Sequence, residues 1–215
     1  MKSKDLITSH YNMKYKFESL KHSEIKKIKL IGYPRDRYEA AVHWGKGNGA
    51  ALEIGAGSGE VASVLSLYYQ EYIATELSIE RVKRLKAIFL DRANIQIVQN
   101  DIEDLNLPFH LQYFDTIILI AVIEHLIEPI SVLKYCYSLL KPGGKILIDT
   151  PNFAKWTRRL KALLGIFPST ASRDEGFLTY EGNSTDLYDE GHLHYFTFRS
   201  LKKLLKERAG FGKVI

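Results

Sequence analysis

Short apolar runs alternate with longer amphipathic runs from residue 50 to residue 152. The short runs are rich in Ile, Val, Tyr and Thr, which favour β-strands, and the longer runs have helical spacing. This alternation is typical of a parallel sheet whose strands are joined by crossover helices, so the sequence predicts an α/β fold. Strands are expected within residues 50–56, 72–77, 94–101, 114–126 and 145–152.

The helices expected between and after these strands carry several boundary signals. Ser78 is a suitable N-cap, Pro129 a suitable first residue, and the Pro-Gly-Gly of residues 142–144 a stop before the fifth strand. Beyond residue 152 the alternation gives way to a basic amphipathic stretch, a long loop rich in turn residues and aromatics, and one further helix. The helices are expected within residues 60–70, 78–93, 129–141, 153–165 and 198–210.

Length and composition fit one ordinary globular domain. The chain has 215 residues, of which 46% are hydrophobic and 26% charged. It has no apolar run near the roughly 20 residues that cross a bilayer, and residues 1–10 do not resemble a signal peptide. The sequence therefore predicts a cytoplasmic protein without membrane insertion.

The charge balance favours anionic partners without requiring nucleic acid. Lys and Arg outnumber Asp and Glu by 30 to 25, which gives a net charge of +5. Part of the excess lies in residues 15–30, whose lysines we interpret as the solvated face of an amphipathic helix. The single cysteine, Cys136, cannot form an internal disulfide and is expected to be a buried apolar residue.

Three glycines, Gly55, Gly57 and Gly59, follow the first expected strand and precede a helix. Backbone N–H groups in such a loop can approach a ligand closely, and the helix N-terminus favours negative or polar groups. A dinucleotide-binding fingerprint would need a glycine where this chain has Glu60, and the lysine of a triphosphate-binding loop is missing. The loop therefore predicts a nucleoside ligand without a pyrophosphate.

Several motifs in order across residues 50–211 resemble those of class I S-adenosylmethionine-dependent methyltransferases. Residues 52–59, LEIGAGSG, resemble the first motif of that family, and residues 139–144, LLKPGG, resemble the turn before its fifth strand. The resemblance implies S-adenosylmethionine as cofactor. It also implies a Rossmann-like three-layer α/β/α sandwich with a mostly parallel central sheet.

The resemblance also assigns roles to individual residues. Glu53 would hold the methionine amino group, and Glu76 would accept hydrogen bonds from both ribose hydroxyls. Asp101 would bind the adenine amino group, and Leu77 would pack on the adenine. As alternatives, Glu76 and Asp101 would be solvated acids at strand ends, and the glycines would serve only the turn. The expected cofactor-binding residues are Glu53, Gly55, Ala56, Gly57, Gly59, Glu76, Leu77, Asp101, Ile102 and Ala121.

Methyl transfer from a sulfonium is an in-line displacement, so the protein contributes positioning and, for a hydroxyl acceptor, a general base. His125, which follows the fourth strand, is the first candidate for this base. His192 and His194 are the second, because their segment resembles the one before the last helix of many relatives. Alternating histidines and aromatics also describe an edge strand packed on a core.

A subset of relatives carries Glu-x-x-Glu-His after the fourth strand and uses it for a divalent metal. This subset includes ubiquinone-type O-methyltransferases and small-RNA 2′-O-methyltransferases. Here Glu124 and His125 match and His192 could supply a further ligand, but Ala121 replaces the first acid. Losing a carboxylate removes a hard oxygen ligand, so the sequence predicts no metal.

The resemblance divides the single domain of residues 1–215 into four parts. These are an N-terminal helical cap (1–48), a cofactor-binding core (49–152), an acceptor-side insertion or lid (153–196), and the last helix with the start of a strand (197–215). Relatives continue with two further strands, so the last strands are expected to be truncated. Either the sequence is a fragment, or another chain, as in a homodimer, covers the exposed edge.

The insertion resembles the lid of a branch that includes homoserine-linked and glycan-linked methyltransferases. Its aromatic residues could enclose a small-molecule acceptor, and Arg158 and Arg159 could meet an acidic one. The alternative is a helix that seals the sheet edge with solvated arginines. Upstream, Tyr11, Tyr33 and Arg37 are expected near the cofactor. The aromatic residues concerned are Phe153, Trp156, Phe167, Phe177, Tyr180, Tyr188 and Tyr195.

The leading functional hypothesis is methyl transfer to a small molecule, with oxygen favoured because histidines suit hydroxyl deprotonation. A nicotinamide-dependent oxidoreductase would need the missing third glycine and a Tyr-x-x-x-Lys, which residues 38–44 do not provide. A non-catalytic cofactor-binding or RNA-binding module is the third hypothesis. It draws on the basic N-terminal stretch, on Ala121 and on the short C-terminus.

Overall fold

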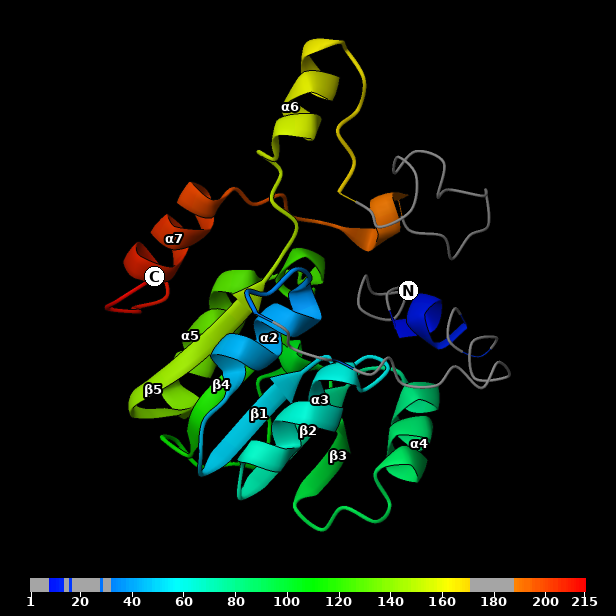
Figure 1. Ribbon diagram of the computed structural model, residues 1–215, viewed down its shortest axis with the longest axis vertical. Helices are drawn as coiled ribbons and strands as arrows, with labels where there is room; N and C mark the ends of the chain where they lie inside the picture. The colour runs from blue at the N-terminus through cyan, green and yellow to red at the C-terminus, as the bar shows by residue number, and fades with distance from the viewer. Residues whose placement is uncertain (1–7, 14–15, 17–27, 29–31, 171–187) are drawn as a thin grey trace.

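A computed structural model describes residues 8–13, 16, 28, 32–170 and 188–215. Its centre is a five-stranded sheet in the order β3-β2-β1-β4-β5, in which every neighbouring pair is parallel (Figure 1). The predicted α/β fold and its five strands are confirmed. The strands are β1 (Ala50–Ile54), β2 (Glu71–Glu76), β3 (Ile95–Gln99), β4 (Phe114–Ile120) and β5 (Leu140–Asp149).

Helices connect the strands and continue beyond the sheet. Residues 8–13 are also helical, and short 3₁₀ turns span residues 66–68, 102–104, 123–125 and 188–191. Among the described residues, no helix has the length and apolar character needed to cross a membrane. The α-helices are α2 (Arg37–Gly45), α3 (Glu60–Leu65), α4 (Ile79–Ile88), α5 (Pro129–Leu139), α6 (Trp156–Leu163) and α7 (Phe198–Glu207).

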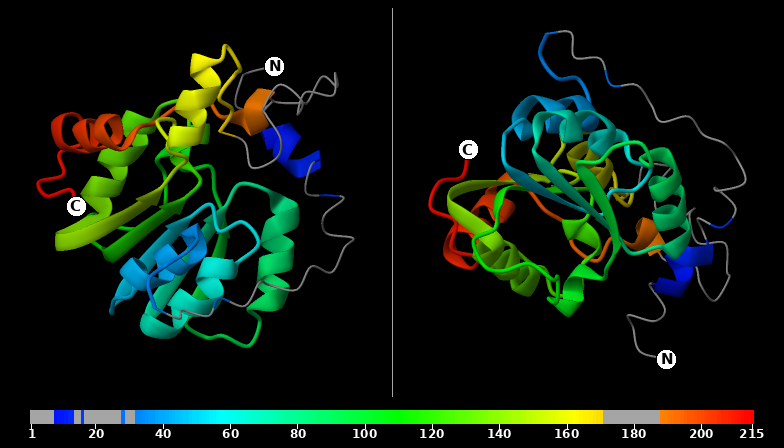
Figure 2. Two further views of the ribbon diagram at one scale, coloured as in Figure 1. Left: turned by 45° about the horizontal axis from the view of Figure 1, so that its top comes forward. Right: turned by 90° about the horizontal axis from the view of Figure 1, so that it is seen from below.

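Helices cover both faces of the sheet, as the two views of Figure 2 show. Successive strand residues point to opposite faces, so Leu52 packs in a core with α5 and α7 while Ala51 packs in a second core with α2, α3 and α4. Cys136 lies in the first core, where burial raises the pKa of its thiol to about 12, which confirms it as a buried apolar residue. The molecule is the expected three-layer sandwich.

The fifth strand begins earlier than predicted. Strand β5 starts at Leu140, which pairs with Phe114, and the regular register resumes where Lys145 pairs with Thr116. The Pro-Gly-Gly of residues 142–144 therefore lies in a bulge inside β5 and does not end a helix. Gly143, at φ 79°, supplies the left-handed conformation that this bulge requires.

Two helix boundaries also differ from the prediction. Helix α3 ends at Leu65 and continues as a 3₁₀ turn, and α4 ends at Ile88. Ser78 occupies the N-cap of α4, but its side chain makes no capping hydrogen bond. Its backbone N–H donates to the carboxylate of Glu76.

The ends of the chain are less regular than the core. Residues 211–215 are not in a strand, in contrast to the strand start expected there. The proposed amphipathic helix of residues 15–30 lies almost entirely outside the described residues.

Candidate active site

The strand order reverses between β1 and β4: β2 and β3 follow on one side of β1, and β5 follows on the other side of β4. In a parallel sheet, such a reversal leaves a crevice at the carboxyl ends of the two central strands. Three hollows follow this edge, of about 160 Å³ beside β2, about 230 Å³ over the glycine loop and about 430 Å³ beside β5. We call them the first, second and third hollow. All three are lined by Ala121 and His125, so they adjoin one another at these two residues.

The glycine loop lies at the start of α3, and Gly55, Gly57 and Gly59 are all left-handed, with φ of 71°, 59° and 91°. A Cβ on Gly55 would lie 2.6 Å from a methyl of Val122, and one on Gly59 would lie 2.8 Å from a methyl of Leu85. Gly55 and Gly59 are therefore required by packing. A Cβ on Gly57 would make only an ordinary contact of 3.5 Å with the Arg81 guanidinium. Gly57 lines the second hollow with Gly55 and Ala56, whereas Gly59 faces the core.

Glu76 lies at the end of β2 and organises the loop beside it. Its carboxylate accepts hydrogen bonds from the N–H of Gly57 (2.9 Å) and of Ser78 (3.1 Å), and the residue is only 6% exposed. The alternative of a solvated strand-end acid is wrong for Glu76. It lines the first hollow, and Leu77, Asp101 and Ile102 line the same hollow.

Glu53 is a buried acid at the second hollow. It is 2% exposed and accepts a hydrogen bond of 2.8 Å from the hydroxyl of Tyr72. Burial raises the pKa of Glu53 to about 8, and the nearby Glu60 and Glu76 add to the shift. A carboxyl group of this kind favours a cationic ligand, because a cation compensates the buried negative charge.

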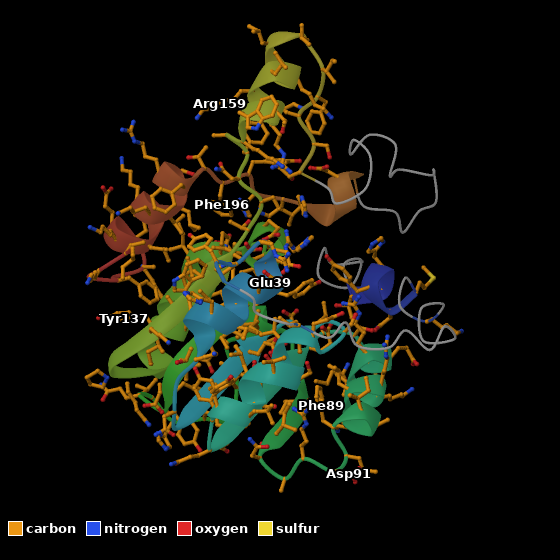
Figure 3. All side chains as sticks on the ribbon, in the orientation of Figure 1. Glu39, Phe89, Asp91, Tyr137, Arg159 and Phe196 are labelled. Carbon is orange, nitrogen blue, oxygen red and sulfur yellow. The ribbon has the colours of Figure 1, made fainter. Side chains whose placement is uncertain are left out.

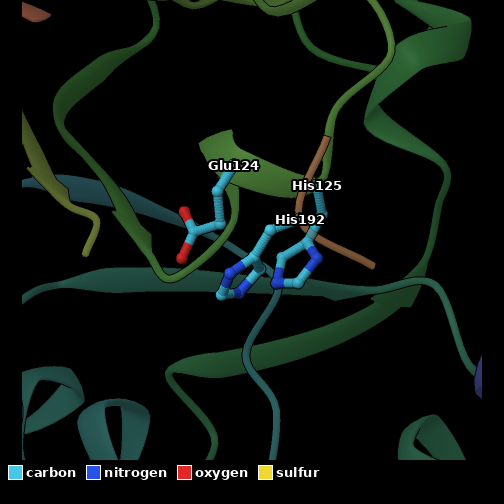
Figure 4. Close-up of side chains that lie close together, drawn as sticks. All are labelled: Glu124, His125 and His192. Atoms are coloured by element: carbon cyan, nitrogen blue, oxygen red, sulfur yellow. The ribbon is translucent and has the colours of Figure 1, made fainter. Parts of the chain in front are cut away.

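Glu124, His125 and His192 meet at the third hollow (Figure 4). One potential ligand atom from each lies within 4.8 Å of the other two. Burial raises the pKa of Glu124 to about 7, and its carboxylate makes no hydrogen bond to any residue in the described part of the chain. The Thr150 hydroxyl is close enough to affect that carboxylate but does not meet hydrogen-bond geometry.

One carboxylate and two imidazoles form a chemically suitable site for a divalent ion. The buried Glu124 carboxylate without a hydrogen-bond partner among the described residues fits such a role. Because Ala121 replaces a carboxylate ligand, the sequence predicts that no metal binds. That statement stays a prediction, and activity measured with a chelator and with added divalent ions tests it.

Two hydrogen-bond partners of Nδ1 orient the ring of His125. Its Nδ1 lies 3.1 Å from the carbonyl oxygen of Gly191 and 3.1 Å from the hydroxyl of Tyr11. Because a carbonyl only accepts hydrogen bonds, we assign the proton to Nδ1, which leaves Nε2 as the basic nitrogen.

The ring of His192 is held through Thr170 and Asp189. The Thr170 hydroxyl lies 2.6 Å from His192 Nδ1 and 3.1 Å from the carboxylate of Asp189. Asp189 is fully buried, but hydrogen bonds from Ser169, Tyr195 and Thr170 outweigh burial and lower its pKa. The Thr170 hydroxyl donates its hydrogen bond to the ionised Asp189 and therefore accepts one from His192 Nδ1–H, so Nε2 is again the basic nitrogen.

Among the upstream candidates, Tyr11 and Arg37 line the site and Tyr33 does not. Tyr11 lines the first and second hollows. Arg37 lines the second and third, where its Nε lies 3.3 Å from a carboxylate oxygen of Asp149. Tyr33 is 77% exposed and packs against Trp44.

The predicted aromatic enclosure is only partly described. Phe153 packs against Tyr195 with ring centroids 5.3 Å apart, but Trp156 is 72% exposed. Phe177, Tyr180 and the side chain of Tyr188 lie outside the described residues, and Phe167 is exposed. His194 packs near Phe196 and does not line the hollows described here.

Helix α6 does not seal the sheet edge, because none of its residues is buried. Arg158 is not a solvated arginine either. Its guanidinium donates to the backbone carbonyls of Asn152 and Ser169, both at 2.8 Å, and it lines the third hollow. Arg159 is exposed on the projecting helix, away from the sheet (Figure 3).

Asp149 and Thr170, which line the third hollow, and Asp189, which lies buried behind it, were not predicted from the sequence. Asp149 ends β5, and a search for acids at strand ends would have found it. Thr170 lies in an irregular segment and Asp189 in the 3₁₀ turn of residues 188–191, and neither segment carries a periodic signal in the sequence. The fold brings Thr170 beside His192, which is 22 residues away in the sequence.

The sheet order, the glycine loop and the buried acids beside it define a class I S-adenosylmethionine-dependent methyltransferase fold. A family model described as "Methyltransferase domain" matches residues 27–214, so the chain belongs to this methyltransferase family.

Curated relatives and solved structures agree with this family. A ubiquinone biosynthesis O-methyltransferase from Haemophilus ducreyi is 26% identical over 159 residues, covering 69% of this chain and 65% of the relative. One of the same name from Xanthomonas euvesicatoria is 32% identical over 104 residues, covering 47% and 42%. The chain thus spans less than two thirds of the length of these relatives.

Two solved structures share the fold. The YcgJ protein from Bacillus subtilis has a TM-score of 0.58 at 18% identity, covering 80% of this chain and 66% of that one. A SAM-dependent methyltransferase from Thermotoga maritima has a TM-score of 0.53 at 20% identity, covering 76% and 64%.

Proposed function

We propose that this chain transfers the methyl group of S-adenosylmethionine to an oxygen atom of a small-molecule acceptor. The observation that carries the proposal is the row of three adjoining hollows: the first, beside Glu76 and Asp101, and the second, beside Glu53, meet the third at His125. The two relatives named as O-methyltransferases support oxygen as the acceptor atom.

The first and second hollows fit the two ends of this cofactor. Glu76 and Asp101 present carboxylates to the first hollow, where a ribose and an adenine amino group would find acceptors. Glu53 presents its buried carboxyl group to the second, where the methionine ammonium would stabilise its ionised form. When bound, S-adenosylmethionine supplies an activated methyl group.

The third hollow is the proposed acceptor site. A hydroxyl placed there lies beside His125, whose basic Nε2 would take its proton as the oxygen attacks. Gly191 and Tyr11 fix the orientation of this ring, and Thr170 fixes that of His192. Arg37 and Lys155 also line this hollow and would favour an acceptor with negative character.

Calorimetric titration tests the cofactor assignment. S-adenosylmethionine and S-adenosylhomocysteine should bind the wild-type protein with micromolar affinity, and NAD should not. Glu76→Ala should abolish the binding, because it removes both the ribose acceptor and the support of the Gly57 N–H. The matched control Glu207→Ala removes an exposed acid on α7 and should bind normally. Binding of NAD alone would favour the oxidoreductase hypothesis.

A further inference from the structure

Helix α6 projects from the body of the protein (Figures 1 and 2). Large apolar side chains of this helix are exposed. Trp156 is 72% exposed, Leu160 49%, Leu163 82% and Leu164 66%. Among the described residues, no other helix exposes so many large apolar side chains. Such a face marks an interaction surface.

These side chains form one continuous stripe. Leu160, Leu163 and Leu164 follow Trp156 by four, seven and eight positions, which places all four on the same side of the helix. Ile166 and Phe167 extend the exposed apolar surface into the turn that follows. We call these six residues the α6 stripe.

The charges around the α6 stripe have one sign. By helical spacing, Arg159 borders the stripe on one side and Lys161 on the other. Lys155 precedes the helix and is exposed. Residues 150–170, the described segment around the helix, contain no Asp or Glu, so the described flanks of the stripe favour an anionic partner.

The helix is fixed in this outward position. Arg158, on the opposite side from the stripe, donates to carbonyls that precede and follow the helix, at Asn152 and Ser169. The buried Asp189 then accepts hydrogen bonds from Ser169 and Thr170. Both ends of α6 are therefore attached to the body while the apolar side faces away from it.

We propose that α6 binds the surface of an anionic lipid bilayer, lying in its plane. The α6 stripe would enter the boundary between headgroups and acyl chains, and Arg159 and Lys161 would meet lipid phosphates. The helix, Trp156–Leu163, is too short to span a bilayer, so this is surface binding.

A second copy of the chain fits this face less well. A twofold contact through the stripe would bring the basic borders of two α6 helices together, and the described segment around the helix, residues 150–170, has no Asp or Glu to compensate them. A lipid surface supplies apolar chains and negative charge together.

Binding in this way would also orient the proposed acceptor site. Lys155 and Arg158, at the foot of α6, line the third hollow. The lipid surface would therefore lie next to that hollow, although binding to the surface does not require the proposed methyl transfer.

Tryptophan fluorescence and vesicle flotation test the proposal on the full chain. The chain has two tryptophans, so Trp44→Phe leaves Trp156 as the sole reporter. With vesicles of phosphatidylcholine and phosphatidylserine, Trp156 emission should shift to the blue and the protein should float. Vesicles of phosphatidylcholine alone should bind far less, and added salt should weaken binding.

Paired variants distinguish vesicle binding through the α6 stripe from non-specific adsorption of the protein to vesicles. Leu163→Ser and Arg159→Glu should each weaken vesicle binding by roughly tenfold or more. The matched controls are Leu90→Ser, at an exposed leucine after α4, and Lys206→Glu, at an exposed lysine of α7. Both controls should bind vesicles like the wild-type protein.

Three results would overturn the proposal. One is no flotation of folded wild-type protein with anionic vesicles, and another is an equal loss in Leu90→Ser and Leu163→Ser. The third is a dimer in sedimentation velocity that Leu163→Ser dissociates while vesicles do not bind, which would assign the stripe to a second copy. The vesicle assay contains no cofactor, so these outcomes are independent of the cofactor titration.

Discussion

Glu53 links cofactor binding to pH. Its buried carboxyl group has a pKa raised to about 8, so it is largely protonated in the free protein at neutral pH. A methionine ammonium is stabilised only by the ionised form, so affinity should rise with pH until about 8 and then level off. Calorimetry across this range measures the effect.

The matched variant Glu53→Gln keeps the shape of the side chain and loses its charge. It should bind S-adenosylmethionine roughly 10- to 100-fold more weakly, as expected for one charge-assisted hydrogen bond, and without this pH dependence. An unchanged pH profile in Glu53→Gln would assign the dependence to another group.

Thr170 determines which nitrogen of His192 carries the proton. In Thr170→Val the hydroxyl between His192 Nδ1 and Asp189 is lost, so the Nδ1–H form should lose its preference. Nitrogen NMR shifts of the imidazole report the tautomer directly. Thr170→Ser should retain the wild-type spectrum, and an identical spectrum for Thr170→Val would show that Thr170 does not set the tautomer.

At the scale of single residues, the motifs predicted that the glycine loop, Glu76 and Asp101 share one sheet edge, because each occupies a fixed place at a strand end, and they line the first and second hollows there. The motifs did not identify Thr170 and Asp189. Those residues come together only when the chain after α6 returns to the third hollow, and no local pattern encodes that approach.

At the scale of elements, the glycine loop joins β1 to α3 through a close packing contact. Gly55→Ala should destabilise the fold by about 1–3 kcal/mol, because its Cβ would clash with Val122 in a left-handed conformation. Gly143→Ala, at a similar φ of 79° but with no atom within 4 Å, should cost less. Denaturant unfolding compares the two, and equal losses would contradict the packing argument.

The sequence predicted the type of these elements better than their limits. Apolar runs buried on both faces identified β1 and β4, but the Pro-Gly-Gly of residues 142–144 looked like a helix stop and is a bulge within β5. Pairing with β4 begins at Leu140, before this turn, and such pairing across the sheet cannot be read from local residue types.

At the scale of the whole molecule, residues from distant regions of the chain line the site. Tyr11 comes from the N-terminal helix, Glu53 and His125 from the sheet edge, and His192 from the segment before α7. The sequence predicted Tyr11 near the cofactor, because the upstream stretches fall where relatives cover it, and it predicted His125 and His192 as candidate bases.

A metal titration decides how the cluster of Glu124, His125 and His192 works. If His125 acts as a base without metal, as the sequence predicts, a chelator should leave the transfer rate unchanged. Restoration of a chelated enzyme by Mg²⁺ or Mn²⁺, with loss in Glu124→Gln, would show instead that the cluster holds a divalent ion.

The central claim is methyl transfer at the third hollow, and formation of S-adenosylhomocysteine tests it most directly. The protein is incubated with S-adenosylmethionine and a pool of small hydroxyl-bearing acceptors, and the product is quantified by mass spectrometry. We predict product formation that depends on the acceptor pool and falls at least roughly 100-fold in His125→Gln. Folded protein that binds the cofactor but forms no product, or His125→Gln that works at the wild-type rate, would contradict the account.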